Sequence, residues 1–249
     1  MPPCGLPSVA VKGIVLAGGS GSRLDPLTRV TNKHLLPIYD RPMIFYPLDT
    51  LRDMGVTEVM VVLGGKSIGD IVELLGDGSE FGLSLTYRYQ REALGIAQAI
   101  GLARDFVGDD ACCIVLGDNI LRGESLRAVA AAFEAGSAGA GCVLYRVDDA
   151  RRFGVAELDA SGRVVAFEEK PDNPKSDVIP IGVYFLRPDA FEVIDTLRPS
   201  ARGELEITEL LNHFARQDRL ASHYYDGHWS DAGTHESLLH AARLRAEQD

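Results

Sequence analysis

The chain has 249 residues, of which 46% are apolar and 24% are charged, and its formal net charge is −11. This length supports a large buried core, and the composition is that of a globular protein. No apolar run approaches the ~20 residues of a membrane span. The acidic balance argues against a nucleic-acid polymer as partner, because phosphate backbones are bound through basic surface.

The N-terminal residues 1–11, MPPCGLPSVAV, lack the basic start and the longer apolar core of a signal peptide. We therefore expect a loose extension there and a cytoplasmic protein. The four cysteines, Cys4, Cys112, Cys113 and Cys142, have no metal-binding spacing. Cys112 and Cys113 are neighbours in an expected buried strand, where thiols usually act as small apolar fillers.

Strands and helices alternate in the first half of the chain. After a strand that ends near residue 17, we expect strands over 56–63, 83–89 and 111–116 and helices over 42–54, 68–75 and 95–106. Gly55 and Gly76 provide helix stops. This alternation predicts a parallel sheet, and the uninterrupted apolar strand 111–116 fits burial on both faces.

The pattern changes after Gly139. Strands are expected over 142–147, 155–158, 164–168 and 178–186, and a turn at 159–162 indicates antiparallel pairing. Helices are expected over 188–197, 208–216 and 234–246. We predict one α/β domain over 12–249 with a Rossmann-like, mixed, mostly parallel sheet flanked by helices. Its first part spans about 12–139, a smaller antiparallel part about 140–233, and a C-terminal helix 234–249.

A glycine loop follows the first strand, in KGIVLAGGSGSRLDPLTRVTNKHLLP. Glycines let a backbone approach a ligand closely, and their N–H groups can form an anion-binding concavity. The basic residues Arg23, Arg29 and Lys33 follow, spaced to reach back toward this loop, and Arg41 extends the cluster. Basic side chains gathered beside a bare backbone on an acidic protein indicate a phosphate site.

Two common nucleotide motifs do not fit this glycine loop. A Walker loop is excluded, since Met60 stands where the first glycine before Gly65-Lys66-Ser67 belongs. A dinucleotide fingerprint needs a third glycine where Leu24 stands. A glycine pair after a strand can also be only a tight turn, and the pair alone does not distinguish this from a phosphate site.

The segments LAGGSGSRL and NKHLLP, in this order, resemble the signature of the sugar-1-phosphate nucleotidyltransferases, nearest to the thymidylyl-transferring members. The resemblance covers Lys12 to about Leu239. It implies a fold of the nucleotide-diphospho-sugar transferase type, with a nucleotide-binding first part and a sugar-binding second part. It also implies nucleotide contacts from Leu16, Gly18, Gly19, Gly21, Ser22 and Arg23, with Lys33 joining Arg23 on the triphosphate.

Two carboxylates are candidate metal ligands. Asp118 directly follows an apolar strand, and ligands of open parallel sheets gather beyond such strand ends; a turn or helix-cap role is the alternative. Asp231, in HWSDAGT, could instead cap the helix that starts near Thr234. In the family that the chain resembles, the matching aspartates hold the metal, and carboxylates plus phosphate oxygens suit Mg²⁺.

The sugar side is indicated by three further segments. The resemblance places Glu169 on sugar hydroxyls, Lys170 and Arg202 on the sugar phosphate, and Gly154 where room is left for the sugar ring. Without it, Glu169 and Lys170 would be ordinary charges at a solvated strand end, and Arg202 a surface arginine before a helix. Lys170 and Arg202, with Arg23 and Lys33, are the predicted catalytic residues.

The base contacts are less well marked. Gln90 and Gly95 keep the family spacing of a glutamine and a glycine five residues later, and both thymine and uracil present an imide edge to such a pair. The chain departs from the thymidylyl enzymes at Ala93-Leu94, where those enzymes have Pro-Asp, and at His34, where they have Gln. For His34 we favour a neutral imidazole that is either packed or on the surface, without a role in the site.

The resemblance implies an enzyme that joins a nucleoside triphosphate, most simply dTTP, to a sugar 1-phosphate, most simply glucose 1-phosphate, with Mg²⁺. Two alternatives stay open: the same chemistry on another base or sugar, including UTP, ATP or a heptose, and a nucleotide-sugar-binding protein without turnover. Homo-oligomers are possible. Longer thymidylyltransferases continue with helices that help form an allosteric site, so we expect weak or absent regulation at such a site.

Overall fold

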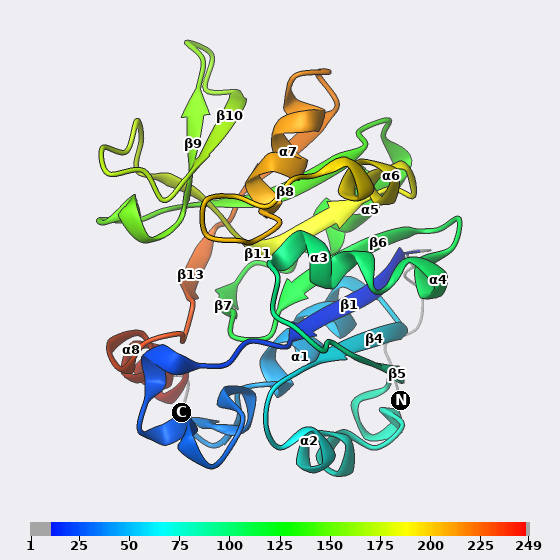
Figure 1. Ribbon diagram of the computed structural model, residues 1–249, viewed down its shortest axis with the longest axis vertical. Coiled ribbons are helices and arrows are strands. Elements are labelled where there is room, and N and C mark those ends of the chain that lie inside the picture. Colours follow the sequence, from blue (N-terminus) through cyan, green and yellow to red (C-terminus); the bar gives the residue numbers. More distant parts are fainter. Residues whose placement is uncertain (1–10, 248–249) are drawn as a thin grey trace.

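The computed structural model describes residues 11–247, and its centre is a seven-stranded sheet in the order β12-β8-β11-β6-β1-β4-β5 (Figure 1). The strands are β1 (Val11–Ala17), β4 (Glu58–Leu63), β5 (Ser84–Tyr89), β6 (Ala111–Leu116), β8 (Ala140–Arg146), β11 (Val178–Leu186) and β12 (Leu220–Tyr224). Only β11 runs antiparallel to its neighbours in this sheet, and the other pairings are parallel. The carboxyl ends of β1, β4, β5, β6 and β8 therefore meet at one edge.

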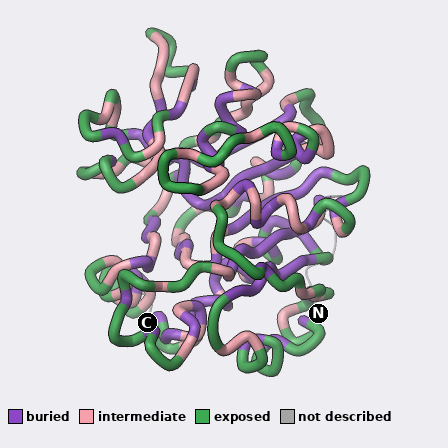
Figure 2. Tube along the Cα trace, in the orientation of Figure 1, coloured by how far each residue is buried: buried purple, intermediate pink, exposed green. Residues whose placement is uncertain are grey.

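One hydrophobic core lies on each face of the central sheet, and the buried strands contribute side chains to both. On β6, Cys113 and Val115 face one core, while Cys112 and Ile114 face the other. This alternation follows from the two-residue period of a strand. Buried segments run through the middle of the fold in Figure 2, with exposed loops around them.

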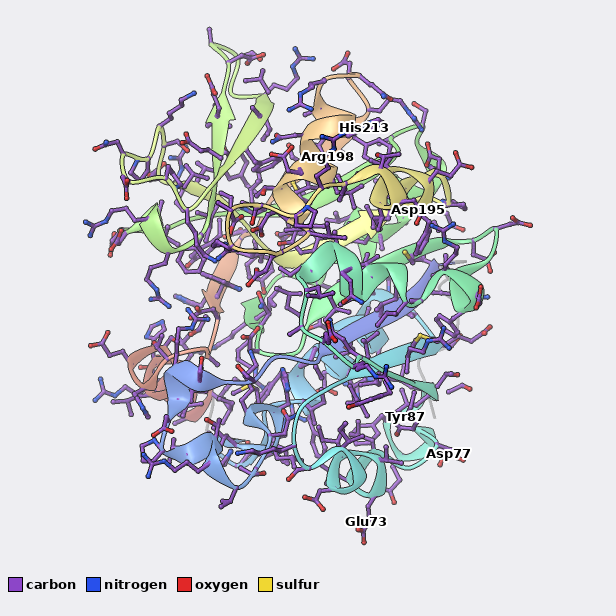
Figure 3. All side chains as sticks on the ribbon, viewed as in Figure 1. Glu73, Asp77, Tyr87, Asp195, Arg198 and His213 are labelled. Atoms are coloured by element: carbon purple, nitrogen blue, oxygen red, sulfur yellow. The ribbon has the colours of Figure 1, made fainter. Side chains whose placement is uncertain are left out.

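Helices cover both faces. Residues of α1 (Phe45–Met54), α2 (Ile68–Leu75) and α5 (Arg127–Ala135) pack in the first core. Residues of α3 (Ile96–Gly101), α4 (Arg104–Val107), α6 (Asp189–Thr196) and α7 (Ile207–Ala215) pack in the second. Tyr87 lies on β5 at the outer edge of the sheet (Figure 3). Its hydroxyl donates a hydrogen bond of 2.5 Å to the carbonyl of Gly76, which ends α2.

Small antiparallel sheets and a last helix complete the fold. They are β2 (Pro37–Ile38) with β3 (Arg41–Pro42), β7 (Ile120–Gly123) with β13 (Gly227–Ser230), and β9 (Gly154–Leu158) with β10 (Val164–Glu169). Helix α8 (His235–Ala246) lies beside β13 and β2. The strand β13 thus carries the chain from β12, at the edge of the central sheet, to α8 beside β2.

The predicted α/β fold with a mostly parallel sheet is confirmed, with two corrections. The single helix expected over 95–106 is wrong: Gly101 ends α3, and a separate helix α4 follows, since glycine is a poor interior residue of a helix. Residues 140–233 do not form only a smaller antiparallel part, because β8, β11 and β12 extend the central sheet. The antiparallel ribbon predicted around residues 159–162 is confirmed as β9-β10.

The cysteines behave as predicted where the structure describes them. Cys112, Cys113 and Cys142 are buried and free, and burial raises the pKa of the Cys112 and Cys142 thiols to about 12. Cys4 lies outside the described residues, as does the expected extension over 1–11 except for Val11, which begins β1. Across residues 11–247, none of the helices has the length and apolar character needed to cross a membrane.

Candidate active site

A pocket of about 850 Å³ opens at the carboxyl edge of the sheet. It is bounded by the loops after β1, β5 and β6 on one side and by β9, the end of β10 and the loop before α7 on the other. All the predicted site residues except Gly21, Arg29 and Arg41 line it. The structure therefore brings the predicted nucleotide, sugar and metal residues to one cavity.

The glycine loop is shaped by its neighbours as well as by its backbone. A Cβ on Gly18 would lie 1.9 Å from Oε1 of Gln90, so only glycine lets this glutamine reach the pocket. Gly21 adopts the left-handed conformation with φ 65°, immediately before the 3₁₀ turn Ser22–Leu24. Gly21 thus turns the chain without lining the pocket, and Ser22 and Arg23 follow it into the wall.

Lys33 is held in place by the residues on either side of it. The side chain of Asn32 donates hydrogen bonds to the carbonyls of Gly64 and Lys66, and its oxygen accepts from the backbone N–H of His34. The ring of His34 is buried, with Nδ1 2.7 Å from Oδ1 of Asn32. Burial, together with the charge of Lys33, lowers the pKa of His34 to about 3, although Asp118 opposes this. Of the two predicted alternatives, the structure shows the packed imidazole and not a surface one.

Asp118 faces Lys33 across the pocket floor. Its Oδ2 accepts a 2.6 Å hydrogen bond from Lys33 Nζ, and Oδ1 accepts one of 3.2 Å from the amide of Asn119. Burial raises the pKa of this carboxyl, but the charge and hydrogen bond of Lys33 outweigh it, and the pKa lies below the usual value. The strand β7 follows at Ile120, so Asp118 is not a helix cap.

Asp231 lies at the end of β13, where it is mostly buried. Its Oδ2 accepts a 3.2 Å hydrogen bond from Nη2 of Arg152. A Cβ on Gly233 would lie 3.4 Å from the same oxygen and 3.1 Å from Nη2 of Arg23, so Arg23 also lies near this carboxylate. Thr234 caps α8 through a capping box with Ser237, which excludes the alternative that Asp231 is the cap.

The residues predicted for the sugar side form a network of acids and bases. Arg202 pairs with Glu169, Glu204 and Glu206 at 2.9–3.3 Å. Lys170 lies 3.3 Å from Glu169 and adopts a positive φ of 44°, uncommon outside glycine. Its backbone N–H donates to the carbonyl of Phe153 at 3.0 Å, which joins the end of β10 to the start of β9.

Gly154 lies against Thr208 at the start of α7. A Cβ at this position would lie 2.5 Å from the methyl carbon of Thr208 and 3.4 Å from Oε2 of Glu169. The hydroxyl of Thr208 is 3.3 Å from the same Oε2. Absence of a side chain at Gly154 is therefore required for Glu169 and Thr208 to come together at the pocket wall.

Gln90 and Gly95 flank a loop that links the two sides. The amide of Gln90 donates to Gln98 at 2.8 Å and leaves its own oxygen beside Gly18. Gly95 has φ 107°, and a Cβ there would lie 2.4 Å from the carbonyl oxygen of Leu205. Backbone hydrogen bonds from Leu205 to Leu94 and from Ala97 to Leu205 tie the Arg202 loop to this segment.

Sequence reasoning was wrong about two of the basic residues and missed others. Arg29 pairs with Asp25 at 2.8 Å with an exposed side chain, and Arg41 pairs with Asp49; neither lines the pocket. Arg29 and Asp25 are only 4 residues apart in the chain, so the nearest carboxylate to Arg29 is a local one. The pocket residues that the sequence analysis did not identify include Asn119, Arg151, Arg152, Tyr184, Glu204, Thr208 and Trp229. The arginines adjoin Phe153-Gly154, which is the signal that could have found them.

The donor set fits a divalent cation that is only partly held by protein. Within residues 11–247, no group of three or more His, Cys, Asp or Glu side chains is placed to hold a metal. Asp118 and Asp231 offer carboxylate oxygens in one pocket, and each is paired with a cation. Magnesium binds through one or two carboxylates, with water and substrate phosphates as the other ligands. Two carboxylates beside a phosphate pocket therefore fit Mg²⁺ chemistry.

Comparisons with known proteins agree with this geometry. A family model described as Nucleotidyl transferase matches residues 12–248. The chain is 45% identical over 235 residues to a glucose-1-phosphate thymidylyltransferase of Neisseria meningitidis, covering 93% of this chain and 81% of the relative. It is 42% identical over 238 residues to the low-salt glycan biosynthesis nucleotidyltransferase Agl11 of Haloferax volcanii, covering 95% of this chain but 66% of that protein.

Two solved structures are also similar. A Bacillus anthracis protein assigned as a glucose-1-phosphate thymidylyltransferase, crystallised with sucrose, superposes with a TM-score of 0.89 at 46% identity, covering 94% of this chain and 95% of that one. A UDP-glucose pyrophosphorylase with bound UDP-glucose has a TM-score of 0.84 at 23% identity, covering 96% and 99%. The second likeness concerns the fold alone.

Proposed function

This chain belongs to the nucleotidyl transferase family, and from that premise we propose that it transfers the thymidylyl group of dTTP to glucose 1-phosphate, forming dTDP-glucose and pyrophosphate. One observation carries the proposal. The basic residues of the glycine loop and those of the sugar side line the same pocket as two carboxylates. Such a pocket can neutralise two polyanions at once, which is what joining them requires.

The reaction needs one bond to form and one to break. An oxygen of the sugar phosphate attacks the α-phosphorus of dTTP, and the bond from that phosphorus to the bridging oxygen of pyrophosphate breaks with its electron pair. No proton transfer is needed, so catalysis consists of positioning and charge neutralisation. An opposite unit charge at about 4 Å is worth ~4 kcal/mol at an effective dielectric of ~20.

We assign the cations by the side of the pocket on which they lie. Arg23 and Lys33 bind the triphosphate, because they follow the glycine loop. Lys170 and Arg202 bind the sugar phosphate, because they adjoin Glu169, whose carboxylate is placed to accept from sugar hydroxyls. The backbone N–H groups at Gly18 and Gly19 complete the triphosphate side.

Asp118 and Asp231 would hold the divalent cation, which we propose is Mg²⁺. When bound, it neutralises phosphate charge and aligns the α-phosphate with the attacking oxygen. Lys33 and Arg152 already neutralise these carboxylates, so the site does not need a metal in order to fold.

The base site is formed by Gln90 and Gly95. The buried amide of Gln90 and the backbone at Gly95 can pair with the imide edge that thymine and uracil share. The thymine methyl is the difference between the two bases. We propose that dTTP is preferred over UTP, because relatives of 40–45% identity are named as thymidylyltransferases. We also propose that the reaction takes place in the cytoplasm.

Pyrophosphate release is the measurement that tests this function. The purified chain is incubated with Mg²⁺ and each pairing of dTTP, UTP, ATP, CTP or GTP with glucose, galactose, mannose or a heptose 1-phosphate. We expect the highest kcat/KM with dTTP and glucose 1-phosphate. A preference for another pair would replace the substrates and keep the reaction class. Binding without release in every pairing would overturn the proposal.

A further inference from the structure

Two adjacent arginines line the pocket but have different partners. Both end the 3₁₀ turn Ala150–Arg152 that leads into β9. Arg151 forms an ion pair of 2.8 Å with Asp149, the residue that caps this turn. Asp149 is not one of the two proposed metal ligands. Arg152 instead binds Asp231 at 3.2 Å. The turn therefore aims one of two neighbouring cations at a proposed metal ligand.

The two carboxylates are paired in unequal ways. Lys33 and Asp118 are both largely buried, with side chains 13% and 14% exposed. In the second pair, Asp231 is 14% exposed but Arg152 is 42% exposed. An ion pair with one partner in solvent contributes little stability and exchanges readily. Arg152 can leave Asp231 at low cost, whereas Lys33 is fixed by its surroundings.

Arg152 also has a second place to go. Its neighbour Phe153 accepts the backbone hydrogen bond of Lys170, so the turn is attached to the sugar-phosphate side of the pocket. Arg152 itself lies over the ring of Phe153, with 5.3 Å from Cζ to the ring centroid. Arginine has a long, flexible side chain, so rotation about its bonds would turn the Arg152 guanidinium from Asp231 toward the side of the pocket that carries Lys170.

We propose that Arg152 is an exchangeable counter-ion. In the free enzyme it neutralises Asp231; when a divalent cation takes that carboxylate, the guanidinium moves to the phosphate of the incoming sugar 1-phosphate. The inference rests on the proposed function for the identity of that phosphate. Arg152 thereby links metal binding to binding of the sugar 1-phosphate, because the guanidinium that leaves Asp231 becomes available to the sugar phosphate.

The first test uses Mn²⁺ alone, with no substrate. Binding is measured from the free Mn²⁺ signal in electron paramagnetic resonance for the full chain and for Arg152→Gln, with Arg151→Gln as the matched control. We expect Arg152→Gln to bind Mn²⁺ about fivefold more tightly, the factor that corresponds to a weak ion pair. Arg151→Gln, which removes the same charge one residue away, should stay within about twofold. Equal affinity of Arg152→Gln and wild type would overturn the proposal.

The second test separates KM from kcat. In Arg152→Gln, the KM for glucose 1-phosphate should rise about tenfold or more, as for loss of a charged hydrogen bond. The KM for dTTP should change less than about threefold, because Arg152 is based on the sugar side. An unchanged KM for glucose 1-phosphate would overturn the second half of the exchange. Arg152→Lys, which keeps the charge, should restore most of both properties.

Two further outcomes separate this proposal from the proposed function. Asp231→Asn should weaken Mn²⁺ binding, and unchanged binding in that variant would remove both Asp231 as a ligand and Arg152 as its competitor. Suppose that the wild-type chain releases no pyrophosphate, while Arg152→Gln, but not Arg151→Gln, binds Mn²⁺ more tightly than wild type. This result would overturn the proposed reaction and support the competition between Arg152 and the metal. Circular dichroism of each variant checks that the substitutions leave the fold intact.

Discussion

Asn119 accepts a 2.6 Å hydrogen bond from Nε1 of Trp229, a residue 110 positions away in the chain. The same oxygen accepts from the backbone N–H of Gly182 at 2.9 Å, and the amide nitrogen donates to Asp118. Trp229 precedes Asp231 by two residues on the strand that carries it. One buried side chain therefore connects both proposed metal carboxylates to the central sheet.

Replacing Asn119 with Ala should destabilise the fold. The substitution leaves the indole N–H of Trp229 and the backbone N–H of Gly182 without their acceptor, and an unsatisfied buried donor costs about 1–3 kcal/mol. We expect the free energy of unfolding, from urea titration, to fall by at least about 2 kcal/mol. Trp229→Phe is the control, because it removes the indole donor but keeps the hydrogen bond from Gly182 to Asn119. It should lower the free energy of unfolding by less than Asn119→Ala does. An Asn119→Ala variant as stable as wild type would contradict this account.

Removing Arg23 should slow the reaction. Arg23 directly follows the glycine loop and its guanidinium lies near Asp231, and loss of one electrostatic donor costs about 10² in turnover. Steady-state kinetics of Arg23→Ala with dTTP and glucose 1-phosphate measure this. Arg29→Ala is the matched control, since the exposed side chain of Arg29 pairs with Asp25 and lies outside the pocket. Similar kcat values for the two variants would remove Arg23 from the site.

Gly154 and Thr208 should be coupled. Gly154→Ala places a methyl group 2.5 Å from the methyl carbon of Thr208, and overpacking of this kind costs about 1–3 kcal/mol. Thr208→Ser removes the opposing methyl but keeps the hydroxyl that faces Glu169. The double variant should therefore recover part of the stability that Gly154→Ala loses, as seen in a double-mutant cycle of unfolding free energies. Simple addition of the two effects would contradict the contact.

The sequence predicted those parts of the fold that follow from local patterns. The strands Ala111–Leu116 and Val178–Leu186 and the helix Ile68–Leu75 have the predicted bounds, because apolar runs and glycine stops define them locally. The membership of β8 and β12 in the central sheet could not be predicted in this way. Their pairings depend on contacts between segments far apart, such as His223 beside Val143.

The same division applies to the site. Asp118 and Lys170 stand in recognisable motifs, so the sequence pointed to them. Arg152 adjoins the Phe153-Gly154 segment, but its proposed role depends on Asp231, 79 residues away. Arg29 shows the opposite error, because spacing alone placed it near the loop while the nearer carboxylate of Asp25 holds it outside. Charge counts along the chain do not reveal which cations are already paired.

His34 should make the protein less stable in mild acid. In the folded chain its pKa is about 3, lowered by burial and by Lys33, whereas an unfolded histidine has a pKa of about 6.5. Above pH 6.5 both states are neutral, and the residue has no effect on the pH dependence. As the pH falls below 6.5, only the unfolded state binds the proton, so the free energy of unfolding decreases.

The loss from this one residue reaches about 2 kcal/mol at about pH 5. Asp118, Asp149 and Asp159 have lowered pKa values, so their contributions are lost only as the pH falls below the ordinary range of carboxyl groups. The interval from about pH 7.5 to about pH 5 therefore isolates His34. Urea unfolding of wild type and of His34→Gln at both pH values measures the difference. The variant, which cannot titrate there, should lose about 2 kcal/mol less than wild type across this interval. If both proteins lost the same amount, a protonated His34 would be tolerated in the folded chain, and its neutral, packed state would have to be given up.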